Sequence, residues 1–207
     1  MKIIIADDHK VVREGLKKIF INSDVEIIGE AASISELLTM IDNEIPDLIT
    51  LDISLPDKSG LDAIKDIKIK SKDVKILMFS IYPDEKFGHR ALAMGADGYL
   101  SKNAEPNEIF SAINKIYKGG KYLKQEVLED LLLSGTDPLN SLPHEKLSDR
   151  EFEVLRLIGH GYKLTVIAEQ LNLSVNTVAS YKSRIQEKLN LNSTAALIKY
   201  TLENQLI

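Results

Sequence analysis

The chain has 207 residues, of which 44% are apolar and 28% charged, and it contains no cysteine. This balance is typical of a globular protein with one large or two small domains, and the missing cysteines exclude disulfides and thiolate metal sites. No apolar run approaches the roughly 18 residues of a membrane helix, and aspartates interrupt the short apolar start, so we expect a cytoplasmic protein without a membrane segment.

The net charge of −5 is unevenly distributed along the chain. Residues 144–207 hold eight Lys or Arg and seven Asp or Glu, whereas the residues before them hold 18 and 24. The first part is therefore acidic and the last part nearly neutral. A nucleic-acid-binding surface in the last part would have little positive charge with which to neutralise phosphates.

The first 120 residues alternate short apolar runs with amphipathic stretches. Strands are expected at Lys2–Ala6, Val25–Gly29, Asp47–Asp52, Lys75–Ser80 and Gly98–Leu100. Helices are expected at Val11–Ile21, Ile34–Glu44, Gly60–Lys70, Glu85–Met94 and Pro106–Lys118. Such alternation predicts an α/β fold, a doubly wound parallel sheet with helices on both faces, and its size suits the flavodoxin-like strand order 2-1-3-4-5.

Turn-forming residues separate this part from the rest of the chain. Gly119–Gly120 follow the fifth expected helix, and a short helix is expected over Gln125–Leu133. Gly135, Pro138 and Pro143 then indicate a linker. The expected organisation is a first domain over residues 1–122, a linker over 123–143 and a second domain over 144–207.

The second domain has a purely helical pattern. A capping-box sequence, Ser148 to Glu151, begins a helix that ends near Gly159 or Gly161. Further helices are expected at Leu164–Leu171, Val175–Leu189 and Thr194–Glu203. Apolar residues at helical spacing are expected to form a common core, namely Ile167, Ala168, Leu171, Val178, Ile185 and Leu189. The pattern predicts an all-α four-helix domain.

Polar residues stand where the expected strands of the first domain end. Asp7 and Asp8 follow the first strand, Asp52 and Ser80 end the third and fourth, and Lys102 follows the fifth. An aspartate at one strand end is commonly a solvated turn residue, but parallel sheets bring these ends to one edge. Carboxylates gathered there repel one another unless a cation binds, and oxygen ligands of this kind suit Mg²⁺.

These residues resemble the motifs of the receiver domain of two-component response regulators. The matching stretches are Asp7-Asp8 after KIIIA, Asp52 in LITLDISLP, Ser80 in ILMFS and Lys102 in GADGYLSK. The resemblance implies that Asp52 accepts a phosphoryl group from a sensor histidine kinase. It also implies a Mg²⁺ site formed by Asp8, the Asp52 carboxylate and the backbone carbonyl of Ser54, with Asp7 acting through water.

The resemblance assigns roles to three further residues. Lys102 would contact the phosphoryl oxygens, Ser80 would hydrogen-bond to them, and Tyr99 would rotate inward as Ser80 moves. Tyr99 could alternatively be a strand residue that only packs on a helix. One difference from the family is that Asn103 follows Lys102 where many receivers have proline.

Leu147–Leu191 resembles the LuxR-type helix-turn-helix of the NarL/FixJ response regulators. The matching stretches are LSDREFEVLRLIGHG and IAEQLNLSVNTVASYKSRIQEKLNL. The resemblance and the exposed face of the third helix predict contact with the major groove of double-stranded DNA. Residues expected at the DNA are Asn176, Thr177, Ser180, Tyr181, Lys182, Ser183 and Arg184. Thr177 and Lys182 are expected at phosphates.

Two features favour a homodimer. The family often has lysines at the positions of Ala179 and Ser183, and their absence here predicts weak binding by a single domain. The last helix has an apolar stripe formed by Ala195, Ile198, Leu202 and Leu206. In the family this helix makes the dimer contact, although the stripe could also pack on its own domain.

The hypothesis that these patterns favour is a phosphorylation-controlled transcription regulator and not an enzyme. An enzyme of the haloacid dehalogenase type would need a second aspartate two residues after Asp52, where this chain has Ser54. A protein-binding adaptor with the same fold but without DNA affinity is the other alternative. The low basic charge of the second domain favours the adaptor slightly.

Overall fold

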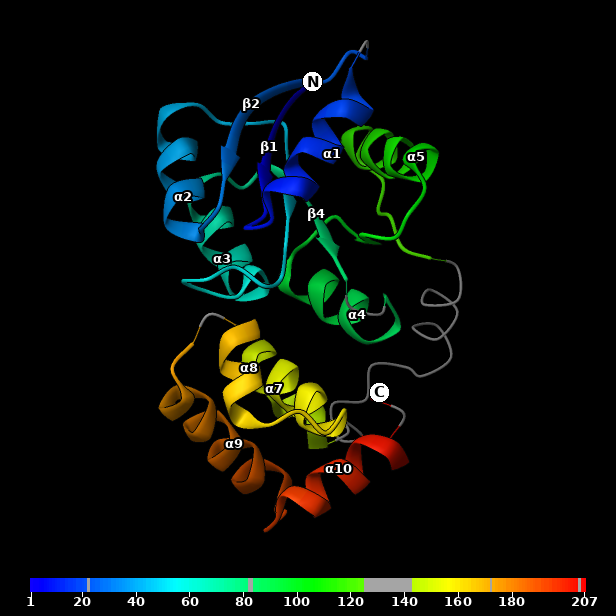
Figure 1. The fold of residues 1–207 in the computed structure, drawn as a ribbon. Helices are drawn as coiled ribbons and strands as arrows, with labels where there is room; N and C mark the ends of the chain where they lie inside the picture. The colour runs from blue at the N-terminus through cyan, green and yellow to red at the C-terminus, as the bar shows by residue number, and fades with distance from the viewer. Residues whose placement is uncertain (22, 82–83, 125–142, 172, 205) are drawn as a thin grey trace. The chain divides into compact units, whose positions relative to one another are not determined.

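The chain forms two compact units, Met1–Thr136 and Asp137–Ile207 (Figure 1). This computed structural model describes residues 1–207 except 22, 82–83, 125–142, 172 and 205. The helix predicted over Gln125–Leu133 lies outside the described residues, as does most of the predicted linker, so the domain bounds stay predictions. In the part that the structure describes, every helix is too short or too polar to cross a membrane.

The first unit contains a five-stranded parallel sheet in the order β2-β1-β3-β4-β5. The strands are β1 (Lys2–Ala6), β2 (Glu26–Ala31), β3 (Leu48–Leu51), β4 (Lys75–Ser80) and β5 (Gly98–Ser101). The predicted flavodoxin-like order is confirmed. The predicted strand bounds differ from these by two residues at most, and Asp52 lies just after its strand.

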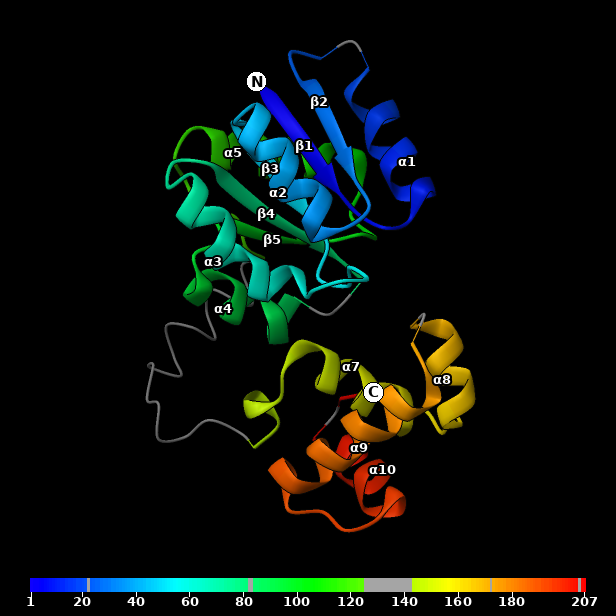
Figure 2. The same ribbon diagram turned by 90° about the vertical axis from the view of Figure 1, so that its left-hand side faces the viewer.

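Five helices cover both faces of this sheet. They are α1 (Lys10–Phe20), α2 (Ile34–Asn43), α3 (Gly60–Lys70), α4 (Asp84–Met94) and α5 (Pro106–Tyr117). Figure 1 shows α1 and α5 on one side of the sheet and α2 and α3 on the other, and Figure 2 shows the strands behind α2 and α3. The layer of α1 and α5 is closed by Phe20 and Phe110, whose rings meet edge to face at 5.4 Å.

The strands are apolar on both faces because helices cover both faces. Ile3, Ile5, Leu77 and Phe79 belong to the core cluster that includes α1 and α5. The residues between them, such as Ile4 and Met78, point to the other face and are equally buried. This double burial explains the continuous apolar runs in the sequence, which are typical of parallel strands.

The second unit is helical throughout its described residues. It contains the short 3-10 helix η2 (Pro143–Lys146) and the helices α7 (Asp149–Gly159), α8 (Leu164–Gln170), α9 (Val175–Leu189) and α10 (Thr194–Glu203). The capping box between Ser148 and Glu151 is present, and Gly161 takes the left-handed backbone (φ 81°) just after α7. The predicted core residues are buried, except Leu171, which is half-buried.

The predicted apolar stripe on the last helix is only partly present. The residues of α10 that pack inward are Leu197 and Thr201, whereas Ala195 and Leu202 are exposed. Leu206 does not belong to the exposed stripe, because the chain turns back after α10 and buries it. Its backbone N–H donates to the Thr201 carbonyl at 2.8 Å, and Arg156 Nε donates to the Leu206 carbonyl at 2.9 Å.

The 3-10 helix η2, which the sequence did not predict, joins the start of this unit to α10. His144 is buried, and its Nδ1 lies 2.9 Å from the hydroxyl of Tyr200. The imidazole also lies against the rings of Phe152 and Tyr200, at centroid distances of 6.0 and 5.9 Å. The segment that follows the predicted linker is therefore attached to the last helix.

Glu151 is expected to make the stability of the second unit depend on pH. Burial would raise its pKa, but the ammonium of Lys188 at 2.6 Å and the Ser148 cap outweigh burial and lower it. Because the pKa of Glu151 is lower in the folded protein, the carboxylate adds stability at pH values above its ordinary pKa of 4.5, and this stability is lost as the pH falls through the folded-state pKa. Glu151→Gln should cost about 1 kcal/mol at neutral pH and flatten this acid dependence.

Hydrogen exchange of the α7 amides in the full-length protein measures this effect. Lys188→Met, which removes the other partner of the ion pair, should weaken protection of α7 at neutral pH in the same direction. An acid dependence of α7 protection that is as steep in Glu151→Gln as in the unchanged protein would contradict the assignment.

Candidate functional site

The sheet brings the acidic residues of the first unit to one edge. Ala6 and Leu51 are partners in the register of β1 and β3, and the Asp52 N–H donates to the Ala6 carbonyl at 2.9 Å. Asp7 and Asp52, one residue further along each strand, therefore become neighbours. The backbone N–H of Lys102 donates to the Ser80 carbonyl at 2.8 Å, which brings the end of β5 to the same edge.

Lys102 bridges two buried carboxylates at this edge. Its Nζ lies 2.6 Å from Oδ2 of Asp7 and 2.7 Å from Oδ2 of Asp52, and each aspartate is only 2% exposed. Burial, together with the charge of Asp7, raises the pKa of Asp52, and Lys102 only partly offsets this. Burial would lower the pKa of Lys102, but the two carboxylates raise it. The two carboxylates thus favour the charged form of the lysine.

One oxygen of Asp52 has no hydrogen-bonding partner among the described residues. This oxygen is Oδ1, a buried atom, and Oδ1 of Asp8 is also buried, with Nδ1 of His9 at 2.7 Å as its neighbour. Ligand atoms of Asp7, Asp8, His9 and Asp52 all lie within 4.8 Å of one another. Buried charged oxygens need a cation or a donor. The donor set, rich in carboxylate oxygen, therefore fits Mg²⁺.

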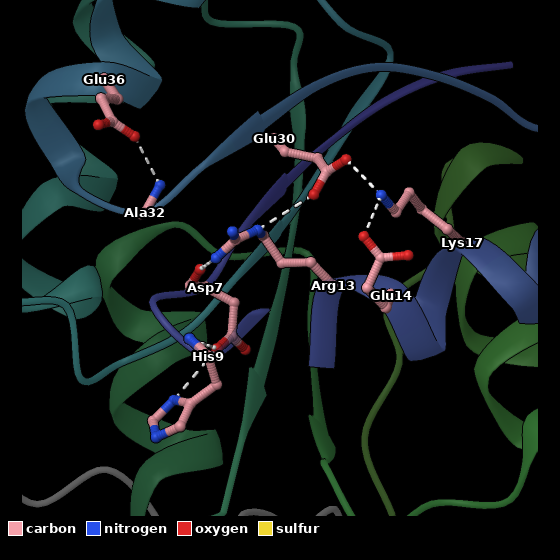
Figure 3. A network of polar contacts seen from close by, with 8 residues as sticks. All are labelled: Asp7, His9, Arg13, Glu14, Lys17, Glu30, Ala32 and Glu36. Carbon is pink, nitrogen blue, oxygen red and sulfur yellow. Dashed lines mark hydrogen bonds and ion pairs between the residues drawn. The ribbon is translucent and has the colours of Figure 1, made fainter. Parts of the chain in front are cut away.

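His9 and Arg13 belong to the site although the sequence analysis did not select them. The His9 N–H donates to Oδ1 of Asp7 at 2.9 Å, and Arg13 Nη1 donates to the Asp7 backbone carbonyl at 2.6 Å (Figure 3). Arg13 is itself held by Glu30 at 3.1 Å, and Lys17 contacts the other oxygen of Glu30 at 2.7 Å. The only sequence signal was the position of His9 directly after the two aspartates.

The two residues expected to form the switch are buried in neighbouring strands of the sheet. Ser80 is the last residue of β4 and Tyr99 lies within β5, and both are fully buried. The Tyr99 ring is thus already buried in this structure, whereas the resemblance implied that it rotates inward only as Ser80 moves. Ser54 lies in the loop after Asp52, where it forms a β-bridge with Ser59, and its backbone N–H helps to lower the pKa of Asp52 against the effect of burial.

The loop that follows Asp52 is held against α2 by Asp57. The Asp57 carboxylate accepts hydrogen bonds from the backbone N–H groups of Ile34 and Ser35, each at 2.9 Å, and from the Ser35 hydroxyl at 2.8 Å. Burial would raise the pKa of Asp57, but these donors lower it. A carboxylate at a helix N-terminus is favourable, so the loop carrying Ser54 is fixed at both ends.

Gly60 permits the close approach of α3 to Asp52. A Cβ atom at this position would lie 1.9 Å from the Asp52 backbone carbonyl oxygen. Gly60→Ala is therefore expected to displace the loop and lower the free energy of unfolding by about 1–3 kcal/mol. Chemical denaturation of the full-length variant measures this loss.

Gly15 in α1 is the matched control for Gly60, since a Cβ there would meet nothing within 4 Å. Gly15→Ala is expected to stabilise the protein by about 0.5–1 kcal/mol, because alanine favours a helix interior over glycine. Equal effects of the two substitutions would contradict the close approach at Gly60.

The second candidate site is the outer face of α9. Val178, Ile185 and Leu189 face the core of the unit. The predicted DNA-contacting residues lie on the other faces: Asn176, Ser180, Ser183 and Arg184 are exposed, and Thr177, Tyr181 and Lys182 are half-buried. The helix is thus available to a partner along most of its length, with Lys182 and Arg184 as cations.

The hydroxyl groups on α9 are already engaged within the helix. Ser180 donates to the Asn176 carbonyl at 2.9 Å and Ser183 donates to the Ala179 carbonyl at 3.1 Å. The hydroxyl of Thr177 lies 2.7 Å from that of Ser174, the N-cap of the helix. In these rotamers the Ser180 and Ser183 oxygens can accept hydrogen bonds, whereas donation to a phosphate requires the hydroxyl to turn.

The two units together define a response regulator, in which a receiver is joined to a helix-turn-helix domain. Residues 3–114 match the family of response regulator receiver domains, and residues 145–201 match the luxR family of bacterial regulatory proteins. The chain therefore belongs to the response regulators of the NarL/FixJ type, with a LuxR-type DNA-binding domain.

Whole-chain relatives agree with this assignment. The response regulator UvrY of Escherichia coli (strain K12) is 32% identical, with 100% of this chain and 95% of that protein covered. The oxygen regulatory protein NreC of Staphylococcus carnosus (strain TM300) is 38% identical, with 100% and 99% covered.

A solved structure agrees over both units as well. It shows RcsB from Salmonella enterica serovar Typhimurium bound to promoter rprA in the presence of the phosphomimetic BeF3⁻. That chain is 27% identical, with a TM-score of 0.64 and 97% of each chain covered. The fold and the regulator class are thereby confirmed.

Proposed function

We propose that Asp52 is the phosphoacceptor of this regulator and that a sensor histidine kinase is its phosphoryl donor. The observation that carries the proposal is the buried Asp52 carboxylate, which has Oδ2 on Lys102 and Oδ1 without a hydrogen bond. In the reaction Oδ1 forms a bond to phosphorus while the bond between phosphorus and the kinase imidazole nitrogen breaks. One oxygen is thus free to attack while the other is anchored.

The carboxylate cluster supports Mg²⁺ as the cofactor. Asp8, Asp52 and the backbone carbonyl of Ser54 would hold the ion, with Asp7 acting through water. When bound, Mg²⁺ would neutralise charge on the phosphoryl oxygens. Lys102 already lies at this edge as a protonated cation and would shift from the carboxylates toward the incoming phosphoryl group.

The added charge would be transmitted by Ser80 and Tyr99. An acyl phosphate adds roughly −1.5 to −2 units of charge, and the Ser80 hydroxyl can hydrogen-bond to it from the end of β4. The Tyr99 ring, already inside the unit, would be held there once Ser80 has moved. Such a change biases an element with two positions and alters the surface of the receiver.

The second unit would then bind double-stranded DNA as part of a homodimer. The N-terminal half of α9 would enter the major groove, with Thr177 and Lys182 at phosphates and Asn176, Ser180, Tyr181, Ser183 and Arg184 close by. Ala195, Ile198 and Leu202 of α10 would form the dimer contact, which their partial or full exposure supports. The second unit of one protomer carries little positive charge, so pairing two protomers would double the number of phosphate contacts.

We further propose that the protein acts in the cytoplasm and that its chemistry is limited to its own phosphorylation. The sequence supports the second part of this proposal, because Ser54 stands where a phosphatase of the haloacid dehalogenase type needs an aspartate. Hydrolysis of an external phosphate ester by the purified protein would instead support an enzyme.

Mapping the modified residue tests the proposal. The purified protein is incubated with a small phosphodonor and Mg²⁺, the acyl phosphate is trapped by reduction, and the peptides are sequenced by mass spectrometry. We expect one modified residue, Asp52, and no modification when Mg²⁺ is chelated. Modification of Asp7 or Asp8 instead would contradict the assignment.

A further inference from the structure

We propose that His9 is an additional ligand at the acidic edge and lets this site bind Zn²⁺ as well as Mg²⁺. The inference rests on the proposed function, because it assumes that the carboxylates around Asp52 hold a metal ion. It goes further by assigning a role to a histidine and by naming a second class of cation, a borderline divalent metal that prefers nitrogen ligands.

The imidazole of His9 lies next to the carboxylates. Its Nδ1 is 2.7 Å from Oδ1 of Asp8 and 3.4 Å from Oδ1 of Asp7. Ligand atoms of all four residues, with Asp52 as the fourth, lie within 4.8 Å of one another. The side chain of His9 is 65% exposed, so the imidazole is largely open to solvent.

The position of His9 is fixed by other parts of the unit. The residue is the N-cap of α1, but its side chain makes no capping hydrogen bond. Its backbone N–H is held by the Asp7 carboxylate, and the Asp7 carbonyl is held by Arg13 (Figure 3). Because Glu30 holds Arg13 and is itself held by Lys17, this network holds the start of α1 against the end of β1.

A second observation points independently to a cation. Asp52 is only 2% exposed, and its buried Oδ1 accepts no hydrogen bond from the residues that the structure describes. A buried carboxylate oxygen without a donor is costly. Lys102 satisfies only the other oxygen. The site thus presents a buried oxygen ligand from Asp52 and an imidazole nitrogen ligand from the largely exposed His9.

The donor set then decides which cations bind. Carboxylate and carbonyl oxygens suit Mg²⁺, whereas imidazole nitrogen suits Zn²⁺ and related metals. Open Zn²⁺ sites use three protein ligands at about 2.0–2.2 Å and leave the fourth position free. Asp8, His9 and Asp52 supply such a set, once the 2.7 Å contact between His9 Nδ1 and Asp8 Oδ1 opens to admit the ion. Mg²⁺ would use the oxygens and leave the imidazole unbound.

Calorimetric titration of the full-length protein with Zn²⁺ alone and with Mg²⁺ alone tests the proposal. His9→Ala is expected to weaken Zn²⁺ binding at least about 10-fold, in the range seen when groups around a metal are lost, and to change Mg²⁺ binding by no more than about 2-fold. Nitrogen NMR of the unchanged protein should show the His9 Nδ1 resonance shifting with Zn²⁺ and not with Mg²⁺.

Two further variants test whether the ions bind at the acidic edge. His160 is an exposed histidine of the second unit, so His160→Ala should leave the binding of both ions unchanged. Asp52→Asn should weaken both. Zn²⁺ binding that is unaltered by His9→Ala, or an equal loss for both ions, would overturn the inference. Failure of the unchanged protein to bind Mg²⁺ would instead contradict the proposed function.

Discussion

Asp52→Asn is expected to abolish phosphoryl incorporation from a phosphodonor. The amide has no nucleophilic anion, and the neighbouring carboxylates of Asp7 and Asp8 serve other roles at this edge, with Asp7 on Lys102 and Asp8 beside His9. The loss should be complete and not partial, since the described structure offers one carboxylate here with a free, buried oxygen held beside the lysine. Intact-mass spectrometry after donor treatment measures it.

The control is Asp57→Asn, which changes an aspartate of the same loop. The Asp57 carboxylate binds the N-terminus of α2 and not Lys102, so this variant should still incorporate one phosphoryl group. Labelling that persists in Asp52→Asn would remove Asp52 from its role, and loss of labelling in Asp57→Asn alone would place the acceptor elsewhere.

Asp52→Asn is also expected to stabilise the fold when Mg²⁺ is absent. Burial and the charge of Asp7 raise the pKa of Asp52, which means that the ionised form is less favourable in the folded protein than in the unfolded chain. Removing that charge should raise the melting temperature at neutral pH. Added Mg²⁺ should narrow the difference, because it binds the folded form of the unchanged protein more tightly than that of the variant.

Lys182→Ala is expected to weaken DNA binding equally for every sequence. Lys182 lies on the half-buried side of α9 and is expected at a phosphate, so its loss should reduce the slope of log affinity against log salt by about 1 for each lysine removed. In a homodimer two lysines are lost per complex. Gel-shift titrations at several salt concentrations measure the slope on DNA selected from genomic fragments by the phosphorylated protein.

Lys199→Ala provides the matched control within the same unit. Lys199 is a highly exposed lysine of α10 that pairs with Glu203 of the same helix. Its removal changes the net charge by the same amount and should leave the salt slope nearly unchanged. Equal slopes for the two variants would show that α9 is not the DNA-contacting helix and would favour the adaptor alternative.

The fold of both units could be predicted from the sequence because local patterns and packing agree. The strands of the first unit are apolar on both faces, and Ser148 with Glu151 marks the start of α7, so the elements match the structure within two residues. The short helix η2 was missed because it depends on His144 meeting Tyr200, 56 residues away. Leu206 was misplaced because the chain reverses after α10, which helical periodicity does not reveal.

The acidic edge could be predicted in part. Strand ends of a parallel sheet meet, so Asp7, Asp52 and Lys102 could be placed together from their positions alone. The role of Arg13 could not, because it depends on Glu30 of the neighbouring strand β2 lying beside α1. Which oxygen of Asp52 stays free also depends on the bridging position of Lys102, a feature of the folded structure only.

The central claim is that charge arriving at Asp52 controls DNA binding by α9. The most direct measurement is the affinity of the full-length protein for a selected genomic DNA fragment at one fixed salt concentration, with and without a phosphodonor. We predict that the donor tightens binding by the unchanged protein and has no effect on Asp52→Asn. Equal affinity of the unchanged protein in both conditions, or tightening that survives in Asp52→Asn, would contradict the claim.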